Sequence, residues 1–187
     1  MKKFFYLLLP LFALSLTSCG DNEEEILPPD PQPKKEATQF EVNYNCKPSA
    51  TYFECYDITA TYTDINGKTV SETLSYDKPL NYHATVSLQG FTKPAKYSCK
   101  VVGKKKDVTF PEGKGGIFSC TSNFLLQELY ENGEIAEFSY NKSPIGYGNT
   151  PIGSVESPMP YAPLMERNPE ITFMDVTFDF QKANNPE

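Results

Sequence analysis

The sequence contains no tryptophan and only one histidine, His83, among its 187 residues. A single histidine excludes bis-histidine haem ligation and a His-Glu-x-x-His zinc site. The Gly-x-Ser-x-Gly nucleophile motif and the Cys-x-x-Cys spacing of zinc sites are also missing. His83 falls on the polar face of an expected strand, so we interpret it as a structural residue. We therefore expect no metal, no cofactor and no enzymatic activity.

The chain also lacks an apolar run of membrane-spanning length. Residues 4–14 are apolar apart from Pro10, and as a helix they would rise only about 16 Å against a hydrocarbon core of about 30 Å. They follow a short basic start, Met1-Lys2-Lys3, and precede the small residues Thr17 and Ser18. A basic start, a short apolar run and small residues form a secretory signal. The sequence therefore predicts that residues 1–18 are a signal peptide.

The end of this signal, Leu16-Thr17-Ser18-Cys19, resembles the lipobox of bacterial lipoproteins. The resemblance implies cleavage before Cys19 and lipidation of its sulfur, so that acyl chains such as palmitate anchor the protein permanently. The acidic residues 21–25 resemble the export signal with which Bacteroidota-type lipoproteins reach the outer face of the outer membrane. The alternative is that these residues are a solvated spacer without an export signal. We expect a lipid-anchored outer-membrane protein that is exposed at the cell surface.

Residues 19–37 are rich in proline and charge and can bury little area, which predicts a flexible tether. The remaining residues, 38–187, are enough for one domain with one hydrophobic core. The whole chain carries a formal charge of −7, and its only basic run is residues 104–106. This balance argues against nucleic acid as a partner and against binding to anionic lipid through bulk charge.

Alternation of apolar and polar residues is the dominant pattern of the domain. It predicts half-buried strands over residues 40–46, 56–62, 82–88, 97–101 and 174–180. Asn-Gly pairs in residues 64–67 and 131–134 predict hairpins. Short strands joined by such turns favour an all-β fold, an antiparallel two-sheet immunoglobulin-like sandwich, although the tryptophan of antibody cores is absent.

The second hairpin has a rival, because residues 124–130 could also start as a short helix. We prefer the hairpin, in which Leu129 faces Ala136 and Gln127 faces Phe138. The stretch 57–70 resembles hairpins of small immunoglobulin-like exported domains in Bacteroidota lipoproteins. With the lipobox, this resemblance implies a surface lipoprotein that serves outer-membrane nutrient uptake or adhesion.

Four cysteines follow Cys19, and an exported protein can form disulfides from them. They are Cys46, Cys55, Cys99 and Cys120. Four cysteines allow three pairings, and we favour Cys46–Cys55 or Cys99–Cys120 because each pair flanks a local connection. Cys55 falls on the polar face of its strand unless a bulge turns it. Free buried cysteines are the alternative.

Residues 141–169 contain six prolines and three glycines and show neither strand nor helix period. Long loops in compact domains are uncommon and are usually functional or disordered. Tyr147 and Tyr161 in this loop are therefore candidate binding residues; alternatively, the loop crosses the sandwich and packs against it. We expect a non-enzymatic binding or accessory module, transporter-associated or adhesin-like, whose partner is an outer-membrane protein complex or an extracellular polymer. The alternative is a glycan-binding or hydrolytic protein of a nutrient-uptake system.

Overall fold

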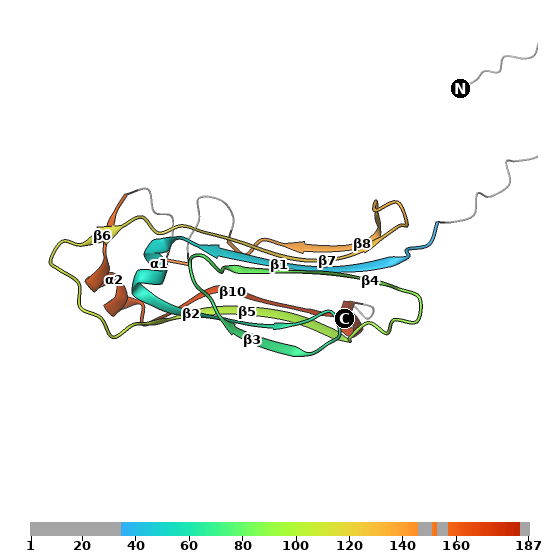
Figure 1. The fold of residues 1–187 in the computed structure, drawn as a ribbon, viewed down its shortest axis with the longest axis horizontal. Helices are drawn as coiled ribbons and strands as arrows, with labels where there is room; N and C mark the ends of the chain where they lie inside the picture. The colour runs from blue at the N-terminus through green and yellow to red at the C-terminus, as the bar shows by residue number, and fades with distance from the viewer. Residues whose placement is uncertain (1–34, 146–150, 153–156, 184–187) are drawn as a thin grey trace, which may run out of the picture. The chain divides into compact units, whose positions relative to one another are not determined.

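The computed structural model describes residues 35–145, 151–152 and 157–183. The predicted signal peptide, Cys19, nearly all of the predicted tether and Tyr147 lie outside these residues. Two four-stranded antiparallel sheets pack face to face as a sandwich (Figure 1). The all-β, antiparallel two-sheet sandwich predicted from the alternation is thus confirmed. None of the described helices is long and apolar enough to cross a membrane.

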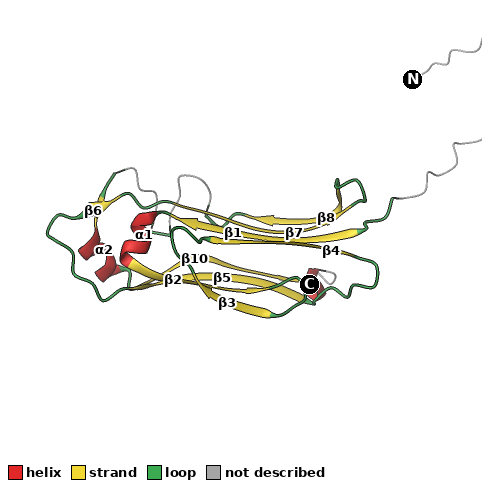
Figure 2. Ribbon diagram, in the orientation of Figure 1, coloured by secondary structure: helices red, strands yellow, loops and turns green. Residues whose placement is uncertain are grey.

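Figure 2 shows that nearly all of the domain is strand and loop, with helices only at the ends of the sandwich. One sheet has the order β4 (Leu80–Ser87), β1 (Gln39–Pro48), β7 (Cys120–Leu129), β8 (Ile135–Lys142). The other has the order β10 (Glu170–Asp179), β5 (Lys96–Lys105), β2 (Tyr56–Thr63), β3 (Thr69–Thr73). The two-residue strands β6 (Gly115–Gly116) and β9 (Met159–Pro160) pair with each other. The helices are α1 (Ala50–Cys55), α2 (Tyr161–Arg167) and α3 (Phe180–Ala183).

The order of connections is immunoglobulin-like, with one insertion. The β1–β4 pair and the β10–β5–β2–β3 sheet correspond to the B–E pair and the G–F–C–C′ sheet of that fold. The position beside β1, where an A strand would lie, is occupied by β7. This strand and β8 form a hairpin that is inserted in the chain between β5 and β10. The insertion is a feature that the sequence patterns do not predict.

The core is aromatic and lies between the two sheets. Tyr44 of β1 packs on Phe124 of β7, with ring centroids 4.8 Å apart, and meets Tyr62 of the opposite sheet at 5.8 Å. Tyr140 of β8 and Phe178 of β10 close one side of the sandwich, with ring centroids 4.5 Å apart. Burial of a large apolar side chain stabilises the fold by roughly 1.5–3 kcal/mol. The alternating residues of the sequence therefore form the main stabilising contact.

Both predicted hairpins are present. Gly67 has φ 84° and Gly133 has φ 81°, which the tight turns require. The alternative of a helix over residues 124–130 is wrong, because these residues lie in and just after β7. The predicted facing pairs are also wrong: an irregularity between Gln127 and Leu129 sets Leu129 opposite Ile135 and Gln127 opposite Ser139.

The prediction that residues 141–169 have no regular structure is wrong, since the segment contains β9 and α2. The prolines do not prevent the helix, because Pro160 is its N-cap and Pro163 lies in its first turn, where backbone N–H groups have no intrahelical acceptor. Leu164 and Met165 are buried against the core. The described part of the segment therefore packs against the sandwich, which is the alternative that the sequence left open.

Candidate binding site

One end of the sandwich, opposite the end at which the chain enters at Lys35, is closed by three segments that we call the cap: α1, residues 106–119, and residues 159–167 (Figure 1). Backbone hydrogen bonds join them. Lys106 N donates to Cys55 O at 2.9 Å, and Tyr161 N donates to Lys114 O at 3.0 Å. The cap is therefore built from three stretches that are distant in the sequence and are held together by hydrogen bonds.

Tyr161, a predicted binding residue, lies inside the cap with only 3% of its surface exposed. Its ring packs edge-on against Phe110 at 4.8 Å and Phe118 at 5.8 Å. Burial raises the pKa of the Tyr161 phenol, and the carboxylate of Glu54 adds to this shift. The position of Tyr161 is a correction to the sequence prediction, because this ring supports the cap and does not offer a face to a ligand.

Lys114 forms a salt bridge with Glu54 that joins two segments of the cap. Its Nζ is 2.6 Å from Glu54 Oε2 and lies 5.2 Å from the centre of the Phe110 ring. The hydrogen bond to Glu54 raises the pKa of Lys114. Gly115 and Gly116 follow directly, and a Cβ at Gly116 would come within 2.7 Å of the Tyr161 hydroxyl. Gly115 and Gly116 are thus closely packed, although the composition of this stretch is typical of a flexible turn.

A hollow of about 580 Å³ opens beside the cap and is the candidate binding site. Its size is in the range of ligand-binding clefts. Two of its walls are residues 47–51 and residues 119–121, and the third is Tyr76. Ser49 joins the first two walls: its backbone N donates to Ser119 O at 2.8 Å, and its Oγ accepts from Ser119 N at 3.2 Å. Four residues that carry hydroxyl groups line the hollow: Ser49, Thr51, Ser119 and Thr121.

Tyr76 is the aromatic side chain of this hollow, and 56% of it is exposed. It lies at the tip of the turn between β3 and β4. That turn is fixed by two backbone hydrogen bonds between Ser75 and Lys78, each 3.1 Å long. Sequence reasoning missed Tyr76; the available signal was an aromatic residue inside a polar turn, outside any alternating pattern. A tyrosine ring offers an apolar face and a polar tip, a combination suited to contact with a partly polar ligand.

Three of the four exposed large apolar side chains among the described residues belong to the hollow or the cap. The four are Tyr76, Val108, Ile117 and Ile135. The first three belong to the hollow or the cap, whereas Ile135 begins β8 near the opposite end (Figure 1). Exposed apolar groups that cluster mark interaction surfaces more often than scattered ones.

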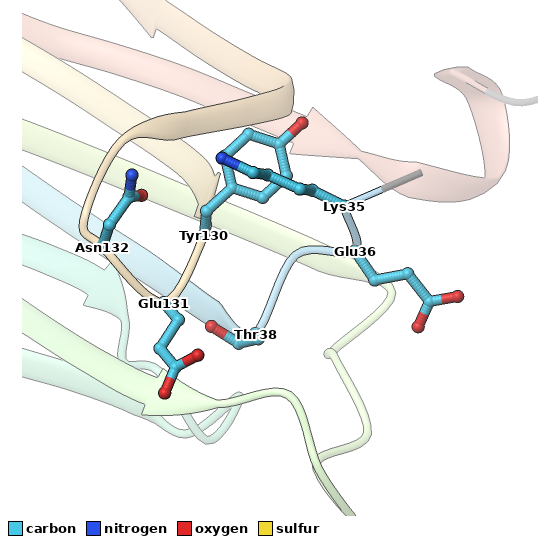
Figure 3. A pocket seen from close by; sticks show the side chains of 6 residues that line it. All are labelled: Lys35, Glu36, Thr38, Tyr130, Glu131 and Asn132. Atoms are coloured by element: carbon cyan, nitrogen blue, oxygen red, sulfur yellow. The ribbon is translucent and has the colours of Figure 1, made fainter. Parts of the chain in front are cut away.

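A second hollow, of about 410 Å³, lies where the chain enters the sandwich (Figure 3). It is lined by Lys35, Glu36 and Thr38 from the entering chain and by Tyr130, Glu131 and Asn132 from the β7–β8 turn. Five of its six lining residues are charged or polar and exposed. We therefore prefer the hollow at the cap, which has two walls held together by hydrogen bonds and an exposed aromatic ring.

His83 bridges strands on the outer face of the first sheet. Its Nε2 is 3.0 Å from Glu41 Oε1, while Glu41 Oε2 accepts a hydrogen bond from Gln127 Nε2 at 2.8 Å. The three side chains link β4, β1 and β7, so the interpretation of His83 as structural fits its contacts. In the described part of the chain, no group of three or more His, Cys, Asp or Glu side chains could hold a metal ion.

All four cysteines of the domain are buried free thiols in this structure, so neither favoured disulfide is formed. Cys46 and Cys120 are the pair in contact, with their Sγ atoms 3.9 Å apart. Cys55 is buried because it ends α1, directly before β2, and so does not lie on the polar face of a strand.

No protein-family model matches the chain, nor does any curated protein or solved structure. Fold and site therefore define it only as a two-sheet antiparallel sandwich with a capped end and an adjoining polar hollow.

Proposed function

We propose that the protein is a lipid-anchored, non-enzymatic binding module of the bacterial outer surface. In this proposal residues 1–18 are removed, Cys19 carries the lipid, and residues 19–37 are the tether that leads to the sandwich. The observation that carries the binding role is the hollow beside the cap, which is lined by serine and threonine residues and by the exposed Tyr76. This surface lies at the end of the domain remote from Lys35, so a tether attached there leaves it accessible (Figure 1).

The chemistry of the hollow favours an extracellular glycan as the bound partner. A sugar ring has an apolar face that can stack on Tyr76 and hydroxyl groups that can exchange hydrogen bonds with Ser119 and Thr121. Lys47 adds one positive charge to the lining, which suits an acidic polymer. An outer-membrane protein complex that contacts Val108 and Ile117 is the second kind of partner.

The test compares two single variants of the full-length protein on intact cells: Tyr76→Ala, and Ile135→Ala as the matched control. The two side chains are 56% and 57% exposed, but only Tyr76 lines the hollow. We expect Tyr76→Ala to weaken retention of labelled surface polysaccharides by roughly fivefold or more, because loss of an aromatic contact in a binding site costs over about 1 kcal/mol. Ile135→Ala should bind as the unchanged protein does. Equal retention by all three proteins would exclude the hollow as the site.

The same cells test the anchor. Cys19→Ala should abolish incorporation of a labelled fatty acid and move the protein out of the washed membrane fraction, because one sulfur carries the attachment. Immunolabelling of unpermeabilised cells then reports whether the sandwich faces outward. A Cys19→Ala protein that still takes up fatty acid would contradict the lipobox interpretation without affecting the result for Tyr76.

A further inference from the structure

Two of the cysteines lie side by side between neighbouring strands. Cys46 is on β1 and Cys120 begins β7, and their sulfurs are 3.9 Å apart in the core. We propose that Cys46 and Cys120 form a disulfide that joins two walls of the hollow at the cap. The inference goes beyond the proposed function, since it assigns a modification site and a pairing.

The strand register brings the two cysteines together. Pro48 is opposite Cys120 and Cys46 is opposite Ser122, so the cysteines are diagonal neighbours whose side chains both point into the core. A disulfide requires a sulfur–sulfur distance of about 2.05 Å, so these atoms must approach by roughly 1.9 Å. Diagonal neighbours on paired strands lie about 7–8 Å apart, at the upper limit for a disulfide, so closure needs rotation of both side chains and a small movement of the backbone where β7 begins.

The remaining cysteines have different surroundings. Cys55, at the end of α1, has the charges of Glu54, Lys114 and Lys106 nearby. Cys99 is opposite Val176 on one side and Tyr62 on the other in the sheet. The inference therefore predicts one disulfide and two thiols in the domain, and not two disulfides.

The chemistry is thiol–disulfide exchange with an external disulfide, carried by a protein oxidant or by oxidised glutathione. The Cys120 thiolate attacks one sulfur of the oxidant, which forms a mixed disulfide and expels one thiolate. The Cys46 thiolate then attacks Cys120 Sγ, which forms the intramolecular bond and expels the second thiolate. The two protein thiols are oxidised, the oxidant is reduced to two thiols, and the two protons released by the cysteines pass to them.

The exchange belongs to folding and not to the finished structure. Cys46 is fully buried, and both the adjacent Cys120 and burial raise the pKa of the Cys46 thiol far above its usual value. The attacking thiolate is therefore scarce once the sandwich has closed. The finished bond would connect residues 74 positions apart and tie the inserted strand β7 to β1.

The proposed disulfide would lie between two walls of the hollow. One wall, residues 47–51, begins directly after Cys46, and the other, residues 119–121, contains Cys120. The disulfide would hold these walls at a fixed separation. A role in ligand binding rests on the proposed function, whereas the pairing itself rests only on the sulfur positions.

The test uses the full-length protein purified in detergent, unfolded, reduced, and refolded with a mixture of oxidised and reduced glutathione. Free thiols are then alkylated and the digested protein is examined by mass spectrometry without reduction. We expect one cross-linked peptide pair that contains Cys46 and Cys120, with Cys55 and Cys99 alkylated. Alkylation of both Cys46 and Cys120, or a cross-link to another cysteine, would overturn the proposal.

A second measurement connects the bond with stability. Reduction should lower the melting temperature of the refolded protein by on the order of 10 °C, because the bond closes a long loop. The Cys55→Ala/Cys99→Ala variant should keep this response, and the Cys46→Ala/Cys120→Ala variant should lose it. If the latter does not fold, the peptide map of the unchanged protein decides alone. Neither result depends on the binding behaviour of Tyr76→Ala, so the two proposals fail separately.

Discussion

At the scale of single residues, the buried tyrosines differ in whether the phenol has a partner. The Tyr97 hydroxyl donates to Ile65 O at 2.9 Å. The Tyr44 hydroxyl is equally inaccessible but has no hydrogen-bond partner in the structure. An unpaired buried hydroxyl costs free energy, whereas a paired one contributes about 1 kcal/mol. The same chemical group therefore has opposite effects at these two positions.

This difference predicts opposite effects of one chemical change. Tyr44→Phe keeps the ring contacts and removes the unpaired hydroxyl, so the free energy of unfolding should rise by about 0.5–1 kcal/mol. Tyr97→Phe removes a bond and leaves the Ile65 carbonyl without that donor, so the free energy should fall by about 1–2 kcal/mol. Urea unfolding of the two variants at neutral pH measures both values. A clear loss of stability in Tyr44→Phe would mean that its hydroxyl has a partner.

At the scale of elements, the strands were predictable and the short helices were not. Period-two alternation covers enough residues in β1, β2 and β5 to stand out from chance, because each strand buries one whole face. The six residues of α1 are too few to show a helical period. The pattern in residues 141–169 was obscured by prolines that happen to occupy permitted positions in α2.

The two hairpin turns permit a comparison at this scale. A Cβ on Gly67 would lie 3.0 Å from Pro94 Cγ, whereas a Cβ on Gly133 would have no neighbour within 4 Å. Both glycines have positive φ. Gly133→Ala should therefore cost about 1 kcal/mol from backbone strain alone, and Gly67→Ala should cost more, about 2 kcal/mol.

Thermal unfolding of both alanine variants, followed by circular dichroism, measures this difference. The larger decrease in melting temperature should belong to Gly67→Ala. Equal decreases would show that the contact with Pro94 adds nothing to the strain of the turn.

At the scale of the whole molecule, the candidate site depends on strand order, which the local patterns of a single sequence do not predict. Tyr76, residues 47–51 and residues 119–121 meet only because β4 and β7 both pair with β1. Strand order depends on long-range packing, which local periodicity does not encode. The same reason explains why the sequence does not predict the contact between Cys46 and Cys120. Distance along the chain favours other pairs, whereas β7 lies beside β1 only in the folded sheet.

The concentration of buried phenols and thiols predicts a property of the entire domain, its loss of stability in alkali. Burial raises the pKa of Tyr56 and Tyr62 to about 12 and, with a contribution from Glu54, that of Cys55 to about 11. Burial likewise raises the pKa of Cys99 to about 12. In the unfolded chain these groups ionise near pH 8.5 for cysteine and near pH 10 for tyrosine.

Whether the free energy of unfolding rises or falls with pH depends on the number of protons bound in the folded and unfolded states. Below about pH 8 both states hold these protons, so the groups add no pH dependence. Between about pH 8.5 and 12 the unfolded chain releases protons that the folded domain retains, and each such group lowers the free energy of unfolding by up to about 1.4 kcal/mol per pH unit. Urea midpoints measured from pH 7 to pH 12 should therefore be constant at first and then fall with increasing steepness.

Tyr44→Phe should reduce the steepness of this fall above pH 10, since burial raises the pKa of that phenol as well. A midpoint that stays constant to pH 12 would contradict the burial of these groups.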